Sequence, residues 1–212
     1  MTDVGREERG AAWTHRGTLS APAEHASLAT VGVGPDGLPI ALWTRPEDAG
    51  TLHEREDRGP DSASFPRTRP TRPPRAAVTR HTTTGSLESV VLVNDVRVSH
   101  PFIQPLRDGE FVIAGSRAAW RPEGPERNLH HYSSSGDLIA AWCIGDGIAH
   151  LQTDAPGRIW AGYFDEGVYG NFGWGRPGPP PLALPASWPG QPTAKWSGRS
   201  TPRRAPSMTA MP

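Results

Sequence analysis

Six residues near the end of the longest apolar segments have side chains that could bind a ligand. An acidic pair is followed by aromatic and amide side chains, and a histidine precedes them after a Gly-Asp-Gly turn. Because loops at strand ends commonly carry binding sites, these residues predict a polar site on a loop face. The alternative is a glycine-shaped loop whose acids accept backbone N–H groups. The six are His150, Asp165, Glu166, Tyr169, Asn171 and Trp174.

Other groups that could bind a metal ion lack suitable spacing. His130 and His131 are adjacent, so on a strand they point to opposite faces and cannot share an ion. The four residues from Asp154 to Gly157 are too few for a calcium loop, which needs about twelve. Cys143 has no second cysteine for a zinc site, so we interpret it as a small buried apolar residue. We expect no metal, cofactor or catalytic group.

An arginine- and proline-rich segment, Pro66–Arg75, has two interpretations. "PRTRPTRPPR" could bind nucleic acid or an SH3 domain. It has no interleaved aromatic residues, however, and residues 1–175 carry a net charge of −5 (17 basic against 22 acidic residues). We therefore expect a polyproline linker between two strands, and no nucleic-acid partner.

Composition excludes several classes of protein. The longest apolar run in the 212 residues, Leu138–Ile144, is far shorter than the roughly 20 residues that a transmembrane helix needs. No apolar signal segment occurs in Met1–Ser20, and a single cysteine cannot form a disulfide framework. These features predict a soluble, cytoplasmic, single-domain protein without a membrane partner.

Short apolar segments separated by glycine turns predict an all-β chain. Asp-Gly and Ser-Gly steps between extended segments are hairpin signals, because glycine adopts the positive φ that such turns need. No window of ten residues has helical periodicity without glycine or proline. The ten expected strands are Ser27–Val33, Leu38–Trp43, Ala76–Thr82, Leu87–Val93, Phe102–Leu106, Glu110–Ala114, Asn128–Ser133, Leu138–Ile144, Ile148–Thr153 and Arg158–Phe164.

The hairpins recur at the spacing of propeller blades. Gly109 and Gly157 occupy similar turns 48 residues apart, and a four-stranded unit every 40–50 residues is typical of a β-propeller. The sequence thus predicts an N-terminal segment at 1–24, partly disordered, and about two and a half blades at 25–175, with an insert at 45–75. Both alternating faces of Arg158–Phe164 are apolar, which suggests a strand covered on both sides, as in stacked blades or any sandwich.

Residues 62–175 resemble a family of β-propeller-like proteins from high-GC bacteria. Gly145–Gly175 is also similar to the propeller repeats of two-component-regulator sensors. The shared segments are "SFPRTRPTRP" from Ser64, "QPLRDGE" from Gln104, "ERN" from Glu126, "GDGI" from Gly145 and "YFDEGVYGNFGWG" from Tyr163. The resemblance implies a fold and no established reaction. Streptogramin-type lyases are propellers that use a histidine and Mg²⁺, so similarity to them would make His150 a general base.

The tail, residues 176–212, has an unusual composition. It contains ten prolines and no acidic residue, which predicts disorder without sheet pairing. The gene encodes 21 arginines and one lysine, so it is rich in G and C, and out-of-frame translation would give such a composition. Read one nucleotide earlier, Pro189–Gly198 permits "AWSADGEVVW" and Ser207–Pro212 permits "IDDCYA", a string that the resembled family has in its next blade. We therefore predict a frameshift between Gly175 and Trp188.

Two functions remain open at this point. The first is a truncated, non-catalytic propeller scaffold that binds an unidentified protein or small molecule through its loop face. The second is a metal-assisted lyase or hydrolase on the same fold. No His-plus-acid pattern repeats across the blades, so the sequence favours binding. Unclosed blades also expose strand edges, which predicts self-association.

Overall fold

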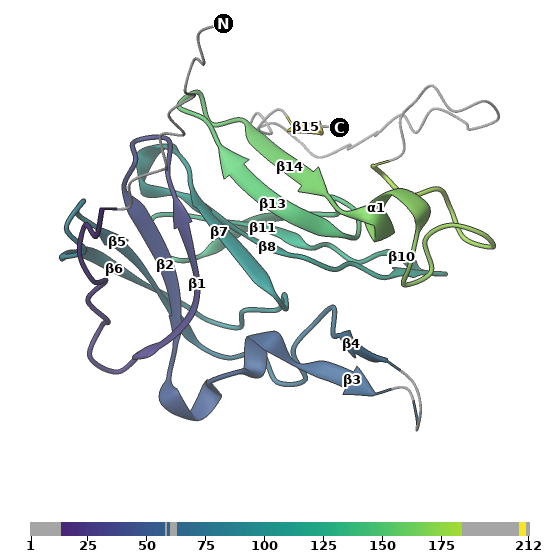
Figure 1. Cartoon of the computed structure of the whole chain (residues 1–212), viewed down its shortest axis with the longest axis horizontal. Helices are drawn as coiled ribbons and strands as arrows, with labels where there is room; N and C mark the ends of the chain where they lie inside the picture. Colours follow the sequence, from purple (N-terminus) through teal and green to yellow (C-terminus); the bar gives the residue numbers. More distant parts are fainter. Residues whose placement is uncertain (1–13, 58, 60–62, 184–207, 211–212) are drawn as a thin grey trace, which may run out of the picture.

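The computed structural model describes residues 14–57, 59, 63–183 and 208–210 (Figure 1). Among them, all ten expected strands are present, with ends shifted by at most two residues, so the all-β prediction is confirmed. They form hairpins around the expected turns. The ten are β1 (Ser27–Val33), β2 (Pro39–Thr44), β5 (Ala76–His81), β6 (Leu87–Val93), β7 (Pro101–Pro105), β8 (Phe111–Gly115), β11 (Leu129–Tyr132), β12 (Leu138–Trp142), β13 (Ile148–Thr153) and β14 (Ile159–Tyr163).

Eight of these strands form two antiparallel sheets of four. The first sheet has the order β1-β2-β5-β6, and the central sheet has the order β7-β8-β11-β12. In both, each strand pairs with the next of these strands along the chain, through a short turn or, from β2 to β5 and from β8 to β11, through a longer connection. The strands of the two sheets lie at 27–93 and 101–142, within the segment 25–175 that was expected to form blades.

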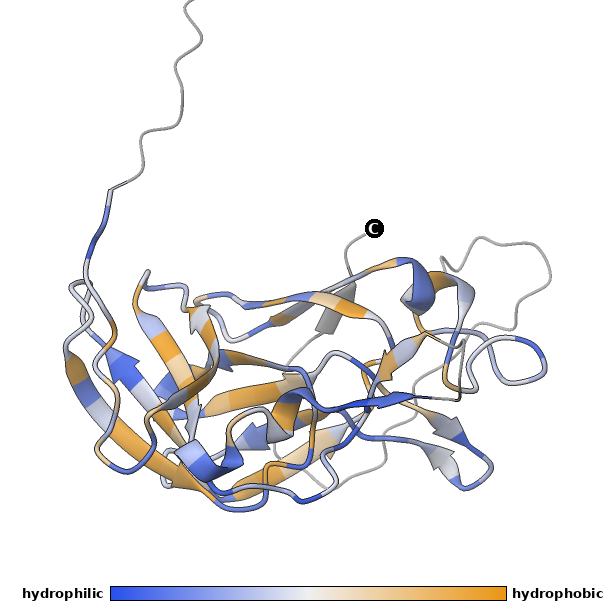
Figure 2. Ribbon diagram, turned by 60° about the horizontal axis from the view of Figure 1, so that its bottom comes forward, coloured by the Kyte–Doolittle hydropathy of each residue, from blue (hydrophilic) through white to orange (hydrophobic). Residues whose placement is uncertain are grey.

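Apolar side chains cover both faces of the central sheet. One face packs on the first sheet through Phe111, Ile113 and Tyr132. The other packs on the third sheet, built on β13 and β14, through Val112, Ala114 and Leu129. Successive residues of β8 therefore point into two different cores, and every residue of this strand is buried. Figure 2 shows apolar colour concentrated on these strands inside the molecule.

One edge strand from each sheet lines the middle of the molecule. Strand β7 contacts β1 of the first sheet and β13 of the third sheet. The turn after β11 also reaches the first sheet, where a Cβ on Gly136 would lie 2.1 Å from the carbonyl oxygen of Leu92. Only glycine fits this approach, and its φ of 90° is one that glycine adopts freely. The three sheets therefore pack in chain order.

The expected insert at 45–75 lies between β2 and β5. It begins with two 3₁₀ turns, η1 (Pro46–Asp48) and η2 (Thr51–His53), and continues as a hairpin of β3 (Arg55–Asp57) and β4 (Ser64–Pro66). Figure 1 shows this hairpin projecting away from the three sheets. A further 3₁₀ turn, η3 (Arg107–Gly109), joins β7 to β8, and the short strands β9 (Trp120–Arg121) and β10 (Gly124–Pro125) form a small hairpin.

The described part of the tail differs from the structure predicted for it. Strand β15 (Met208–Ala210) pairs in parallel with β14, so the expectation that residues 176–212 make no sheet pairing is wrong. The outer edge of β14 is therefore not bare: its free N–H and C=O groups accept an extended partner. Residues 184–207, which hold most of the predicted out-of-frame segment, lie outside the described residues, and the frameshift stays a prediction.

Two further expectations about the third sheet need correction. Residues Asp165–Tyr169 form a short helix, α1, where an irregular loop was expected. In β14 only Ile159 and Ala161 are fully buried, whereas Trp160 is half-buried, so one face of this strand is covered rather than both. Among the described residues, no helix has the length and apolar character to cross a membrane.

The double burial of the central sheet predicts a matched set of alanine substitutions. Ile113→Ala and Leu129→Ala, one in each core, should each lower the free energy of unfolding by about 2–5 kcal/mol. Ile139→Ala is the control, because this β12 side chain is 47% exposed and should cost less than about 1 kcal/mol. Urea denaturation measures all three. A small effect of either buried substitution would show that its face of the sheet is not packed.

Candidate functional site

The sequence-predicted site residues around α1 mostly hold the local fold together. The carboxylate of Asp165 accepts the N–H of Glu166 at 2.9 Å. Glu166 forms an ion pair with Arg117, and the indole of Trp174 donates to the carbonyl oxygen of Ala118 at 2.8 Å. The structure thus brings Glu166 and Trp174 to one segment, the loop after β8, where both act as packing contacts.

The other three predicted site residues do not join them. Tyr169 is 75% exposed, and the side chain of Asn171 accepts the N–H of the next residue. His150 is exposed on β13, opposite Gly162 of β14. Within the described part of the chain, no hydrogen bond or ion pair links His150 to Asp165 or Glu166. The single ligand site expected from these six residues therefore stays a prediction.

A buried ion pair lies beneath α1. Arg117 donates from Nε and Nη2 to the two carboxylate oxygens of Asp146, both at 2.8 Å, and these side chains are 4% and 1% exposed. Asp146 also accepts the N–H of Ala118 at 2.9 Å. The guanidinium lies 4.4 Å from the centre of the Phe172 ring, a cation–π contact. The pair therefore ties the loop after β8 to the segment before β13 and to the loop after α1.

Asn128 reinforces the same region. Its buried amide group donates to the carbonyl oxygens of Gly115 and Gly145 and accepts the N–H of Ile144, at 2.8–3.0 Å. Each bond satisfies a backbone group where the central sheet ends, and such groups are costly to leave unpaired. Thus "ERN" and "GDGI" have structural roles that the sequence alone did not assign.

The remaining candidates for reactive chemistry are occupied by structural contacts. His130 donates to the carbonyl oxygen of Arg127, and burial lowers its pKa, whereas His131 contacts Glu110 at 2.7 Å. The two histidines thus have different partners, as adjacent strand residues should. Cys143 is half-buried, and burial raises the pKa of its thiol to about 11, so it stays protonated at neutral pH. The described residues hold no group of three side chains suited to a metal ion.

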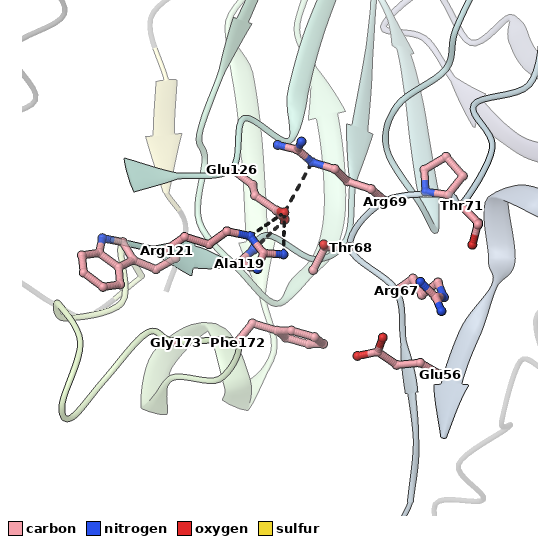
Figure 3. A pocket seen from close by; sticks show the side chains of 12 residues that line it. Glu56, Arg67, Thr68, Arg69, Thr71, Ala119, Arg121, Glu126, Phe172 and Gly173 are labelled. Carbon is pink, nitrogen blue, oxygen red and sulfur yellow. Dashed lines mark hydrogen bonds and ion pairs between the residues drawn. The ribbon is translucent and has the colours of Figure 1, made fainter. Parts of the chain in front are cut away.

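A pocket of about 470 Å³ lies between the insert and the central sheet, within the range of small-molecule sites. Figure 3 shows charged side chains from separate segments facing this space. Its walls contain three arginines, two glutamates, two threonines and two aromatic rings. The lining residues are Glu56, Arg67, Thr68, Arg69, Pro70, Thr71, Ala119, Trp120, Arg121, Glu126, Phe172 and Gly173.

Glu126 is the buried centre of the charged wall. Its Oε2 accepts the N–H of Ala119 at 3.0 Å, and its Oε1 lies 3.1 Å from Nη2 of Arg121 and 3.4 Å from Nε of Arg69 (Figure 3). Burial alone would raise the pKa of Glu126, but the Ala119 N–H, the Thr68 side chain and the two arginines outweigh it, and the pKa is lowered. Glu126 is therefore ionised and holds two guanidinium groups in place.

The insert builds the opposite wall. Strand pairing of β3 with β4 places Arg67 beside Glu54, whose carbonyl oxygen accepts the Arg67 N–H at 2.9 Å. The Glu54 carboxylate accepts both the N–H and the hydroxyl of Thr71, at 2.8 and 2.6 Å. These bonds fold the segment 67–71 back toward the hairpin, which directs it along the pocket.

The loop after α1 completes the pocket with an aromatic wall. The N–H of Trp120 donates to the carbonyl oxygen of Phe172 at 2.9 Å. A Cβ at position 173 would lie 2.4 Å from the carbonyl oxygen of Trp120, so this contact requires Gly173. Phe172 also contacts Arg117, so the pocket wall is continuous with the buried ion pair.

Sequence reasoning did not identify this pocket. The segment that supplies Arg67 and Arg69 was interpreted as a polyproline linker, and the residues Arg121 and Glu126 were not considered as a site. The available signal was the run of four arginines in ten residues, but Arg121 and Glu126, which meet Arg69 in the pocket, lie more than 50 residues away along the chain. Only the packing of the insert on the central sheet reveals that these charges meet.

The buried ion pair predicts a large effect of removing its cation. Arg117→Met leaves Asp146 as an unpaired buried charge and should lower the free energy of unfolding by about 3–5 kcal/mol. The control is Arg97→Met, because Arg97 and its partner Asp95 are both more than half exposed and the change should cost less than about 1 kcal/mol. Equal midpoints of thermal unfolding for the two variants would contradict this role.

The lowered pKa of Glu126 predicts a pH-dependent contribution to stability. Glu126→Gln should reduce the free energy of unfolding by about 1–3 kcal/mol at pH 7, because it leaves two guanidinium groups without their shared anion. A carboxylate whose pKa is lower in the folded than in the unfolded state stabilises the fold at pH values above its ordinary pKa of 4.5. This stabilisation is lost as the pH falls below that value. The difference from wild type should therefore shrink in acid, as denaturation between pH 7 and 3 can measure.

Glu24→Gln serves as the control for this substitution. Glu24 pairs with Arg45 at 3.2 Å, but its side chain is 74% exposed, so solvent screens the pair. Loss of its carboxylate should change stability little at any pH in this range. A Glu126→Gln deficit that stays constant down to pH 3 would mean that its cause is not the loss of the charge.

Comparison with known proteins supplies no relative. No family model, curated protein or solved structure matches this chain.

Proposed function

We propose that the chain is an incomplete β-propeller scaffold that binds a small-molecule ligand through its loops. Three sheets that follow one another in the sequence also pack in that order, as blades do. Strands β1, β7 and β13 open the three sheets, and β7 contacts both of the others, which suits the innermost strands of neighbouring blades. The family resemblance of residues 62–175 points to the same fold.

The first sheet exposes apolar side chains along its two edge strands. Val31 and Val90, on those strands, are cross-strand neighbours of Ala41 and Thr79 between them, so all four share one face. The two valines are 49% and 44% exposed, whereas Ala41 and Thr79 are buried. Exposed apolar side chains on edge strands are consistent with an unclosed arrangement, in which no further blade packs beside the first.

The observation that carries the binding function is the convergence of three distant segments on the pocket. "SFPRTRPTRP" supplies Arg67–Thr71, "ERN" supplies Glu126, and "YFDEGVYGNFGWG" supplies Phe172 and Gly173. These are three of the five segments on which the family resemblance rests. Of the other two, "GDGI" supplies Asp146 to the buried ion pair near the pocket, and "QPLRDGE" contains the turn η3 between β7 and β8. Segments that lie far apart in the sequence but line one cavity are better explained by a binding site than by independent structural loops.

Binding is favoured over catalysis by the state of the central carboxylate. Glu126 accepts bonds from a backbone N–H, a threonine side chain and two arginines, and its lowered pKa keeps it ionised. A general acid or base needs a pKa near the working pH and a free approach for substrate. Glu126 has neither property, so it orients the arginines.

An NMR screen of the full-length, ¹⁵N-labelled chain against a mixed small-molecule fragment library tests this function. We expect saturable shifts at the backbone amides of Ala119 and Gly173, which line the pocket. Thr68→Trp should abolish these shifts by filling the cavity, whereas Thr84→Trp, in an exposed turn, should leave them unchanged. A dispersed spectrum shows that each variant is folded. The proposal is refuted if no fragment binds, or if the bound fragments shift only amides outside the pocket.

A further inference from the structure

We infer that the pocket recognises an oxyanion, the carboxylate or phosphate group of a small molecule, held between Arg69 and Arg121. The inference rests on the proposed binding function and names the chemistry of its ligand. Charge, donor geometry and the shape of the opposite wall each support it.

The lining of the pocket carries a surplus of positive charge. Arg67 is paired with Glu54 at 4.0 Å, so the surplus lies at Glu126, where two arginines meet one carboxylate. Arg69 and Arg121 approach the same oxygen atom of Glu126, at 3.4 and 3.1 Å. One carboxylate neutralises one of these two guanidinium groups, and their mutual repulsion remains. A second anion at this place would remove that repulsion.

The two arginines retain hydrogen-bond donors after binding Glu126. A guanidinium group has five N–H donors, of which Arg121 directs Nε and Nη2 to Glu126 and Arg69 approaches it with Nε. The side chains are 59% and 57% exposed, so both arginines are accessible to a ligand from solvent. Arginine donors fit the paired oxygens of carboxylate and phosphate groups, and Glu126 already restricts their positions.

The remaining walls orient the ligand. Figure 3 draws both Glu56 and the Phe172 ring below Glu126, on the opposite side of the pocket in this view. Arg69 and Arg121 lie at the Glu126 end of the pocket, and the Phe172 ring offers apolar surface to the rest of the molecule. The pocket therefore suits a ligand with an anionic end and an apolar or aromatic body.

Inorganic phosphate and benzoate are the probes that test this inference. Each is titrated into the full-length ¹⁵N-labelled chain, with sodium chloride at matched ionic strength as the reference. We expect at least one probe to shift the amides of Ala119, Arg121 and Gly173 saturably, and chloride to leave them unshifted. Saturation by phosphate alone identifies a phosphate ligand, and saturation by benzoate alone a carboxylate ligand.

Arginine variants connect the binding to the two side chains. Arg69→Gln and Arg121→Gln should each weaken the probe about tenfold, the loss typical of one charge-assisted hydrogen bond. Arg158→Gln is the matched control, because Arg158 is 51% exposed and pairs with Asp154 in the turn between β13 and β14. It should bind as wild type does. Melting temperatures show whether each variant is folded.

The outcomes separate this inference from the function on which it rests. The oxyanion inference is overturned if neither anion shifts the pocket amides saturably. It is also overturned if Arg158→Gln weakens binding of the probe as much as Arg121→Gln does. If neutral or cationic fragments nevertheless bind at Ala119 and Gly173, the binding function stands and only the ligand class is wrong. If nothing binds in the pocket, both are wrong.

Discussion

The buried ion pair between Arg117 and Asp146 is the constraint on which the loop region depends. Two charges removed from water stabilise a fold only when each is fully paired, and here both carboxylate oxygens and the adjacent Ala118 N–H take part. The loop after β8 and the segment before β13 must therefore meet. Phe172 covers the guanidinium, which brings in the loop after α1. The same loops then present Ala119, Trp120 and Phe172 to the pocket.

Glu126 repeats this arrangement at the surface, where its consequence is different. Its carboxylate is buried, but the arginines it binds extend into solvent. A buried acid that orients exposed cations costs little stability, because the acid is satisfied by a backbone N–H and a threonine whether or not a ligand is bound. The arginines lose less side-chain entropy on binding, since their positions are already restricted. In the proposed function, the same carboxylate therefore serves both the fold and the recognition of the ligand.

The strands could be predicted from the sequence because local signals determine them. The pocket could not be predicted in this way. Alternating apolar residues and glycine turns identified β1, β6 and β13 to the residue. The β3–β4 hairpin lacks the apolar alternation, since its strands are short and polar, and α1 forms within a glycine-rich stretch. The pocket joins Arg69 to Arg121 and Glu126 through contacts between distant segments, which no local pattern encodes. The buried role of Arg117 was equally invisible, because its partner Asp146 is 29 residues away.

In the proposed function, the insert connects ligand binding to the stability of the whole chain. It leaves the first sheet after β2 and returns at β5, and it meets the central sheet through Arg69 and the 119–126 loop. The proposed ligand, held between Arg69 and Arg121, adds a contact between the insert and the β9–β10 hairpin, next to the apolar interface of the first and central sheets. Since a ligand that binds only the folded state shifts the unfolding equilibrium by mass action, occupancy strengthens that junction. In an unclosed stack of sheets, which lacks the mutual support of a ring, a polar bridge at the loop face then resists the separation of the first sheet from the central sheet.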